Sequence, residues 1–140
     1  MAPKNALARF ITLEGGEGTG KSTLARGLAD ALRAKGREVV VTREPGGAPG
    51  ADAIRSLLVS GDANRWSATE EALLFAAARL NHLNHTIRPA LARGAWVICD
   101  RYYDSTRAYQ VAAGGLDPKT LDTLNALIEA PAPDRTFVLD

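Results

Sequence analysis

Residues 10–23, FITLEGGEGTGKST, decide the fold. A short apolar run of strand-forming residues leads into a glycine-rich stretch, and from Gly15 the spacing is G-x-x-x-x-G-K-S. This spacing is typical of the loop that holds nucleotide phosphates. Its glycines permit a tight turn whose backbone N–H groups face an anion, and the following helix adds the positive end of its dipole. The segment therefore predicts a strand, a phosphate loop and a helix, in that order.

Two polar side chains of the predicted phosphate loop have expected roles in binding a nucleotide. Lys21 would reach the β- and γ-phosphates, and Ser22 would be a ligand of Mg²⁺. A glycine-rich turn without a ligand is the alternative, and the order of strand, loop and helix argues against it. We expect a nucleoside triphosphate to contact Gly15, Gly16, Glu17, Gly18, Thr19, Gly20, Lys21, Ser22 and Thr23.

Composition narrows the class of protein. The chain has 140 residues, 46% of them hydrophobic, which suits one domain with a substantial core. Its net charge of +1 gives no field that would attract nucleic acid or a membrane, so we expect neither as a partner. The single cysteine, Cys99, lies in an apolar run and is expected to be a buried core residue. Residues 1–9 lack the apolar stretch of a signal peptide, and no segment is long and apolar enough for a membrane span, so the sequence predicts a cytoplasmic protein.

Hydrophobic periodicity predicts strands that alternate with helices. Strands are expected at 10–14, 37–42, 95–99 and 136–139, and helices at 22–35, 51–59 and 69–87, through 109–110 and from 118. The valines at 39–41 favour a strand buried on both faces, and Leu73 and Leu80 are expected on the apolar stripe of the longest helix. Leu121 and Leu127 are expected to line the helix that begins at 118. Ser67 and Glu70 form a predicted capping box, and Pro89 marks a kink or a boundary. The pattern is that of an α/β protein, a doubly wound parallel sheet with helices on both faces.

Polar side chains follow the third predicted strand. Asp100 ends this apolar strand, where a carboxylate can hold Mg²⁺ directly or through water, although it could also cap the next helix. Arg101 follows, and its guanidinium would clamp phosphate oxygens unless it merely forms a surface ion pair. Arg43, Arg55, Arg79 and Arg101 lie on segments that converge on one strand edge, which indicates an anionic second substrate.

Two pairs of side chains on the longest predicted helix can each be interpreted either as part of a binding site or as ordinary core or surface residues. Phe75 and Arg79 are spaced i, i+4, so an aromatic ring and a planar donor would share one face, which suits a nucleobase. A core position for Phe75 is the alternative. His82 and His85 are spaced i, i+3 without a third ligand nearby, so we expect two exposed histidines rather than a zinc site.

Several blocks together resemble the thymidylate kinase family: EGGEGTGKST, TREPGG, LLFAAARLNH with IRPAL, CDRYYDSTRAYQ and TFVLD, which span residues 10–140. The resemblance implies a nucleoside-monophosphate kinase of the P-loop NTPase class that phosphorylates dTMP to dTDP with ATP and Mg²⁺, in dTTP biosynthesis. It also implies a homodimer packed through the long helices. Another small P-loop kinase, such as a deoxynucleoside kinase, and a non-catalytic nucleotide-binding module remain the alternatives.

The resemblance assigns a role to each matched position. Glu17 would approach the sugar 3′-hydroxyl of dTMP, and Tyr109 would lie under the deoxyribose. Phe75 would stack on thymine, whose edge Arg79 and Gln110 would hydrogen-bond. Thr106 falls where the family has a small polar residue near the base. The dTMP phosphate would be surrounded by Arg43, Arg55 and Arg101, and the transferred group would be neutralised by Lys21, Arg101 and the Mg²⁺ on Ser22 and Asp100.

The chain also departs from the family pattern. Gly114-Gly115 stands where members often have Arg-Gly. The family continues past the fourth strand with a mobile lid, a fifth strand and an adenine-binding loop, so we expect residues 1–140 to be one domain truncated after the fourth strand. Gly18 stands where some members place an arginine; the bacterial members that this loop resembles supply their catalytic arginine from the lid. We therefore expect phosphate-loop binding with little kinase turnover.

Overall fold

The glycine-rich segment lies between the first strand and the first helix, as the sequence predicts. The structure, a computed structural model, describes residues 9–140, so all but Arg9 of the N-terminal segment lies outside it. Among these residues a 4-stranded parallel sheet has the order β2-β3-β1-β4. Its strands are β1 (Phe10–Gly15), β2 (Val39–Arg43), β3 (Trp96–Asp100) and β4 (Arg135–Leu139).

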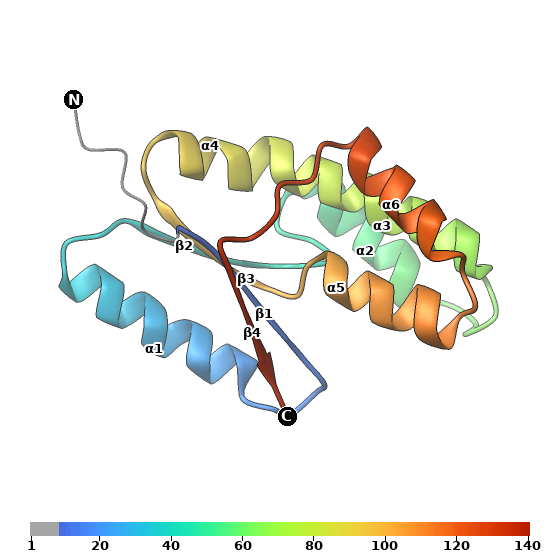
Figure 1. Ribbon diagram of the computed structural model, residues 1–140, viewed down its shortest axis with the longest axis horizontal. Coiled ribbons are helices and arrows are strands. Elements are labelled where there is room, and N and C mark those ends of the chain that lie inside the picture. The colour runs from blue at the N-terminus through green and yellow to red at the C-terminus, as the bar shows by residue number, and fades with distance from the viewer. Residues whose placement is uncertain (1–8) are drawn as a thin grey trace.

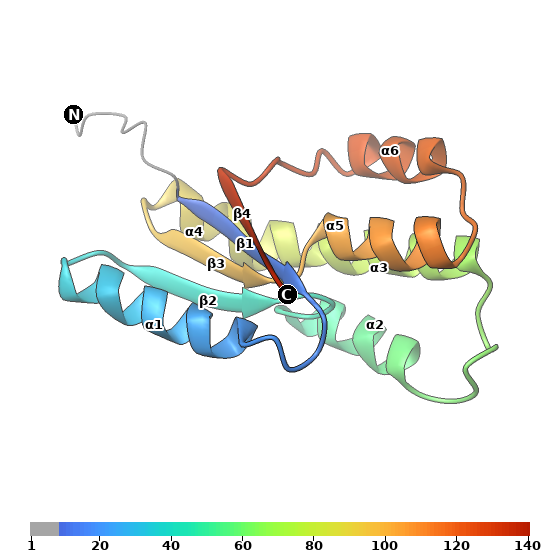
Figure 2. The same ribbon diagram turned by 60° about the horizontal axis from the view of Figure 1, so that its bottom comes forward.

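Helices cover both faces of the sheet (Figures 1 and 2). On one face, α1 (Lys21–Ala34) packs through Ala25 and Ala29 on Ile11, Leu13 and Ile98. On the other face the alternate strand residues, such as Phe10 and Val97, join a buried cluster with Leu83, Ile87 and Ile128. Alternation of burial across both faces confirms the doubly wound α/β architecture.

The remaining helical segments pack on the second face or on one another. They are α2 (Pro49–Val59), α3 (Ala68–His82), the π-helical turn η1 (Leu83–Ile87), α4 (Arg88–Ala92), α5 (Tyr103–Thr106), the π-helical turn η2 (Arg107–Ala113) and α6 (Pro118–Leu127). Ser67 and Glu70 make the predicted capping box. At Pro89, which cannot donate to the preceding turn, the helix passes through η1 and continues as α4.

Three expectations about packing are wrong. Val41 is 43% exposed because β2 is an edge strand that pairs only with β3, so β2 is not buried on both faces. Leu73 and Leu80 are exposed because the buried face of α3 is centred on Ala72, Ala76 and Arg79, beside the predicted stripe. In α6, Leu121 is buried whereas Leu127 is exposed.

Within the described residues, no helix combines the length and apolar character that crossing a membrane requires.

Candidate active site

The phosphate loop (residues 15–23) turns sharply between β1 and α1. At Gly15, where φ is 141°, an added Cβ would lie 2.5 Å from the carbonyl oxygen of Leu139 in the neighbouring strand β4, so only glycine fits. The Lys21 side chain is buried over the loop, and its Nζ donates to the carbonyl oxygens of Gly15 at 2.9 Å and Gly16 at 2.7 Å. The loop thus holds its ammonium group beside the turn where an anion would lie.

A cavity of about 330 Å³ adjoins this loop and connects it with the end of β3. Asp100 is the last residue of β3 and lies opposite Leu13 of β1 and Arg43 of β2 in the sheet register. The carboxylate does not cap the next helix, whose N-cap is Tyr102. The structure brings together on this cavity Glu17, Gly18, Gly20, Lys21, Ser22, Thr23, Asp100 and Arg101.

The Asp100 carboxylate fits a divalent cation. Its Oδ1 is buried and has no hydrogen-bond partner in the described part of the chain. Ser22, which carries a hydroxyl group, lines the same cavity. A carboxylate and a hydroxyl are hard oxygen ligands of the kind that Mg²⁺ binds, usually together with water and nucleotide phosphates. The side chains present are therefore compatible with the predicted magnesium site.

Arg101 lies between the phosphate loop and a second, larger cavity. Its Nη2 donates to Glu17 Oε1 at 3.2 Å and its Nη1 to the Tyr109 hydroxyl at 3.3 Å. Arg101 and Glu17 form an ion pair, which was the alternative role considered for Arg101. The Arg101 side chain is nevertheless only 18% exposed and borders both cavities. Its guanidinium could therefore contact phosphates on either side.

The larger cavity, of about 470 Å³, is here called the acceptor cavity. It is bounded by α2, α3, α5 and η2, and Phe75 lies on its wall rather than sealed in the core. Of the side chains predicted to bind the second substrate, all but one line it: Glu17, Arg55, Phe75, Arg79, Arg101, Thr106, Tyr109 and Gln110.

Arg43 is the exception. Its side chain is exposed and borders a separate groove with Ser22, Arg26 and Asp100 on the α1 side of the sheet. Successive residues of a strand point to opposite faces. Arg43 ends β2 on one face, while the next residue, Glu44, lines the acceptor cavity on the other. The structure therefore places Arg43 beside Ser22 and Asp100 but not on the acceptor cavity with the other residues predicted to bind dTMP.

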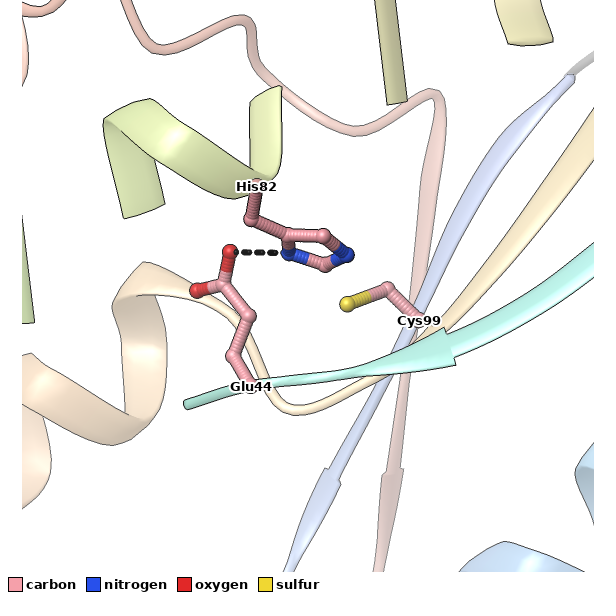
Figure 3. Close-up of side chains that lie close together, drawn as sticks. All are labelled: Glu44, His82 and Cys99. Carbon is pink, nitrogen blue, oxygen red and sulfur yellow. Dashed lines mark hydrogen bonds and ion pairs between the residues drawn. The ribbon is translucent and has the colours of Figure 1, made fainter. Parts of the chain in front are cut away.

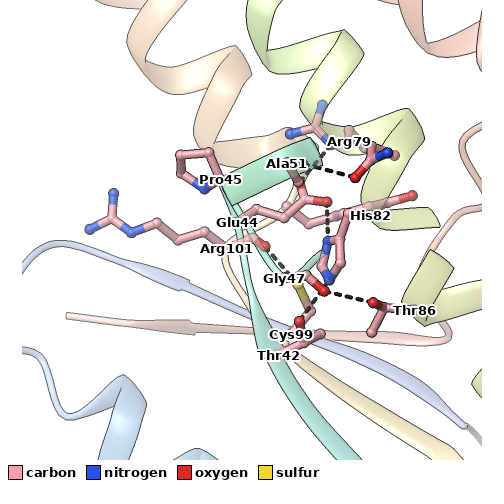
Figure 4. A network of polar contacts seen from close by, with 12 residues as sticks. Thr42, Glu44, Pro45, Gly47, Ala51, Arg79, His82, Thr86, Cys99 and Arg101 are labelled. Carbon is pink, nitrogen blue, oxygen red and sulfur yellow. Dashed lines mark hydrogen bonds and ion pairs between the residues drawn. The ribbon is translucent and has the colours of Figure 1, made fainter. Parts of the chain in front are cut away.

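Arg79 is fixed inside a buried network (Figure 4). Its Nε donates to Glu44 Oε1 at 2.7 Å and its Nη2 to Thr106 Oγ1 at 3.0 Å. The residue is only 3% exposed, and its guanidinium carbon lies 5.2 Å from the centre of the Tyr102 ring. These contacts hold the planar donor group rigidly at the cavity wall.

His82 is not exposed, which corrects the sequence expectation; His85 is exposed as expected. His82 Nδ1 is 2.9 Å from Glu44 Oε2 and its Nε2 is 2.7 Å from Thr42 Oγ1. An i, i+3 spacing could not reveal this, because Glu44 precedes His82 by 38 residues. One oxygen of the Glu44 carboxylate thus pairs with Arg79, and the other oxygen pairs with His82.

Cys99 lies beside this pair, and the ligand atoms of Glu44, His82 and Cys99 are within 4.8 Å of one another (Figure 3). The thiol is buried, as predicted, and donates to the carbonyl oxygen of Arg101 at 3.0 Å. Burial raises the pKa of the Cys99 thiol well above its ordinary value. Each of these groups has a hydrogen-bond partner in the protein, so the three side chains belong to one buried polar network.

Sequence reasoning missed two carboxylates. Glu14, at the end of β1, accepts from the backbone N–H of Tyr102 at 3.0 Å and from the Ser105 hydroxyl, and so anchors the turn after β3. Burial raises the pKa of Glu14, and these hydrogen bonds only partly oppose the shift. Glu71, on α3, accepts from Gln110 Nε2 at 2.7 Å at the acceptor cavity. Glu14 opens the block EGGEGTGKST, but the phosphate-loop spacing starts at Gly15 and gives this carboxylate no role.

Comparisons with known proteins point to one family. A family model described as thymidylate kinase matches residues 13–140. The chain is 61% identical over 133 residues to a thymidylate kinase of Rhizorhabdus wittichii and 55% identical over 132 residues to one of Caulobacter vibrioides, covering 94% of this chain each time. It spans 64% of the length of these relatives. A crystal structure of thymidylate kinase from Ehrlichia chaffeensis matches with a TM-score of 0.82 and 40% identity, over 94% of this chain and 70% of that one.

Proposed function

Because the chain belongs to the thymidylate kinase family, we propose that it transfers the γ-phosphoryl group of ATP to dTMP and forms dTDP for dTTP synthesis. One observation carries the proposal: Glu17 and Arg101 line both the phosphate-loop cavity and the acceptor cavity. A donor triphosphate on the loop and a nucleotide in the acceptor cavity would therefore meet at these side chains.

The residues would act by position and charge. A phosphate oxygen of dTMP is already an anion at neutral pH, so no general base is required. Lys21 would hold the β- and γ-phosphates, and Arg101 would neutralise charge on the group that moves between the nucleotides. Ser22 and Asp100 would hold Mg²⁺, which supplies further neutralisation of the phosphate oxygens.

The acceptor cavity suits a nucleoside monophosphate. Phe75 offers an aromatic face for the base, and Arg79, Thr106 and Gln110 offer polar groups for its edge. Tyr109 and Glu17 lie near Arg101, where the sugar and phosphate would be. Arg55 supplies a second cation, and its Nη1 already donates to the Pro45 carbonyl oxygen at 2.8 Å. Two cations at this end, Arg55 and Arg101, suit a phosphate, which supports dTMP over a neutral nucleoside, the deoxynucleoside-kinase alternative.

We further propose a cytoplasmic homodimer that binds neither nucleic acid nor membranes. The near-neutral charge of +1 supports the last two points. Exposed apolar side chains on α2 and α3, among them Val59 and Leu73, support packing against a second copy. Residues 1–140 would form one domain.

Calorimetric titration tests the proposal directly. This chain should bind dTMP more tightly than thymidine, and ATP more tightly than GTP, in the presence of Mg²⁺. An assay of dTMP, dUMP, dCMP and dGMP as acceptors, with ATP and Mg²⁺, then measures selectivity. Equal affinity for dTMP and thymidine would overturn the assignment.

A further inference from the structure

Gln110 presents an unused acceptor at the acceptor cavity. The residue lies in η2, is 5% exposed and lines the cavity. Its Nε2 donates to Glu71 Oε2 at 2.7 Å. Its Oε1 is buried and has no hydrogen-bond partner among residues 9–140. A buried amide oxygen without a partner is rare in folded proteins and indicates that a ligand completes the set.

The carboxylate of Glu71 determines which end of this amide is free. A carboxylate only accepts hydrogen bonds, so it is satisfied by the Nε2 of Gln110 and repelled by its Oε1. With Nε2 occupied, the amide is held in the orientation that leaves the oxygen available. A neutral amide at position 71 would not impose this choice, because it can donate as well as accept.

The neighbouring Arg79 supplies the complementary donor. Its Nε and Nη2 are engaged by Glu44 and Thr106, whereas its Nη1 makes no hydrogen bond to the described residues. Thymine carries an N3–H donor beside the C4 carbonyl acceptor. Cytosine carries the reverse, an N3 acceptor beside a 4-amino donor. A free acceptor on Gln110 with a free donor on Arg79 therefore matches thymine and mismatches cytosine.

We propose that Glu71 is the positioning residue that sets base choice, by locking the Gln110 amide with its oxygen available to a base that carries an N3–H. Glu71 acts through Gln110 and requires no contact with the nucleotide. The inference rests on the proposed function, since it takes a pyrimidine nucleotide as the occupant of the cavity.

Three variants separate positioning from a structural role. In E71Q the lock on the amide is lost while size is kept. The matched control is E70Q, one residue earlier on α3, where the side chain is exposed and glutamine still serves the capping box. In E71Q/Q110E the carboxylate introduced at position 110 accepts from the amide introduced at position 71. Its second oxygen remains an acceptor, and the net charge of the double variant equals that of the unmodified chain, because one carboxylate is removed and one is added.

Calorimetric titration of each variant with dTMP and with dCMP measures the ratio of the dissociation constants. We expect this preference for dTMP to fall about tenfold in E71Q, the equivalent of one buried hydrogen bond. E70Q should keep it, and E71Q/Q110E should regain most of it. A merely structural role would weaken both nucleotides alike and leave the ratio unchanged.

The outcomes keep the two proposals apart. If the unmodified chain binds dTMP over dCMP and E71Q does so to the same extent, the role of Glu71 is wrong while the proposed function stands. If the unmodified chain shows no preference for dTMP, the proposed function itself fails. Circular dichroism and the melting temperature verify that each variant is folded before its ratio is interpreted.

Discussion

The guanidinium of Arg101 donates to the Glu17 carboxylate over 3.2 Å and so joins the turn after β3 to the phosphate loop. The backbone of Arg101 has a φ of 70°, in the left-handed region that residues other than glycine rarely adopt. Its N–H donates to the carbonyl oxygen of Leu13 at 2.8 Å, which holds the turn against β1. A side chain kept at a strained position indicates that the guanidinium itself is needed there.

Replacing Arg101 should separate stability from binding. R101G relieves the left-handed backbone, so the free energy of unfolding should rise by up to about 1 kcal/mol. Its affinity for dTMP should nevertheless fall at least about tenfold, because a charge-assisted phosphate contact is lost. R101K keeps the charge but not the planar fork and should bind with intermediate affinity. Urea titration and calorimetry give the two quantities, and an R101G variant that binds dTMP normally would contradict the role of this residue.

Removing the charge of Glu44 should strongly destabilise the fold. The side chains of Glu44 and Arg79 are 4% and 2% exposed, so E44Q leaves a buried guanidinium without its counter-charge. We expect a loss of about 3–5 kcal/mol in the free energy of unfolding, measured by urea denaturation. E38Q is the matched control, since Glu38 pairs with Arg93 at 2.8 Å with both side chains at least half exposed.

That control should lose no more than about 1 kcal/mol, as surface ion pairs do. Similar losses in the two variants would mean that the buried network around Arg79 contributes no more than an ordinary surface pair.

Local sequence patterns predicted the parts of the fold that depend on neighbouring residues. The strand, loop and helix around Lys21 follow from glycine spacing, and the cap at Ser67 follows from the position of Glu70. Burial of His82 did not follow, since it depends on Glu44 and Thr42, which reach it only when β2 and α3 pack together. Such contacts have no local signature.

The sequence also did not predict which face of the sheet each residue of β2 points to, or the order of the strands in the sheet. Whether Arg43 or Glu44 faces the acceptor cavity depends on the register of β2 by a single residue, which a run of valines does not fix. The edge position of β2, which exposes Val41, depends on the order of the strands. The lock between Glu71 and Gln110 likewise requires α3 and η2 to be neighbours.

A methyl group at Gly47 should disrupt the buried network of Glu44, Arg79 and His82, because it would collide with His82. Gly47 has a φ of 89°, and an added Cβ would lie 2.3 Å from His82 Nε2. G47A should therefore lower the free energy of unfolding by about 2 kcal/mol or more, from strain and displacement of the imidazole. G27A is the control, because nothing lies within 4 Å of an added Cβ in the middle of α1.

Alanine at position 27 should raise the free energy of unfolding by up to about 1 kcal/mol, since it favours the helix. Thermal and urea unfolding of both variants measures the difference. An unchanged stability of G47A would show that the loop moves freely and does not fix His82.

The thiol of Cys99 should be unreactive in the folded protein. It is fully buried, burial raises its pKa, and only the thiolate reacts with disulfide reagents. The rate of labelling by such a reagent should be roughly a hundredfold slower in buffer than in denaturing urea, because reaction requires the protein to open. Rapid labelling of the native protein would contradict the packing of β3 against the His82 network.

Stability should depend on pH through Glu14. Its pKa in the folded protein is raised above 4.5, chiefly by burial, so the native state binds a proton that the unfolded state has released. The contribution of this carboxyl group is therefore fully present below pH 4.5 and is lost as the pH rises through the raised pKa. E14Q cannot titrate at this position. The difference in unfolding free energy, unmodified chain minus E14Q, should fall from acidic to neutral pH in a urea series. A difference that rises with pH would show that hydrogen bonds from Tyr102 and Ser105 outweigh the burial of the carboxylate.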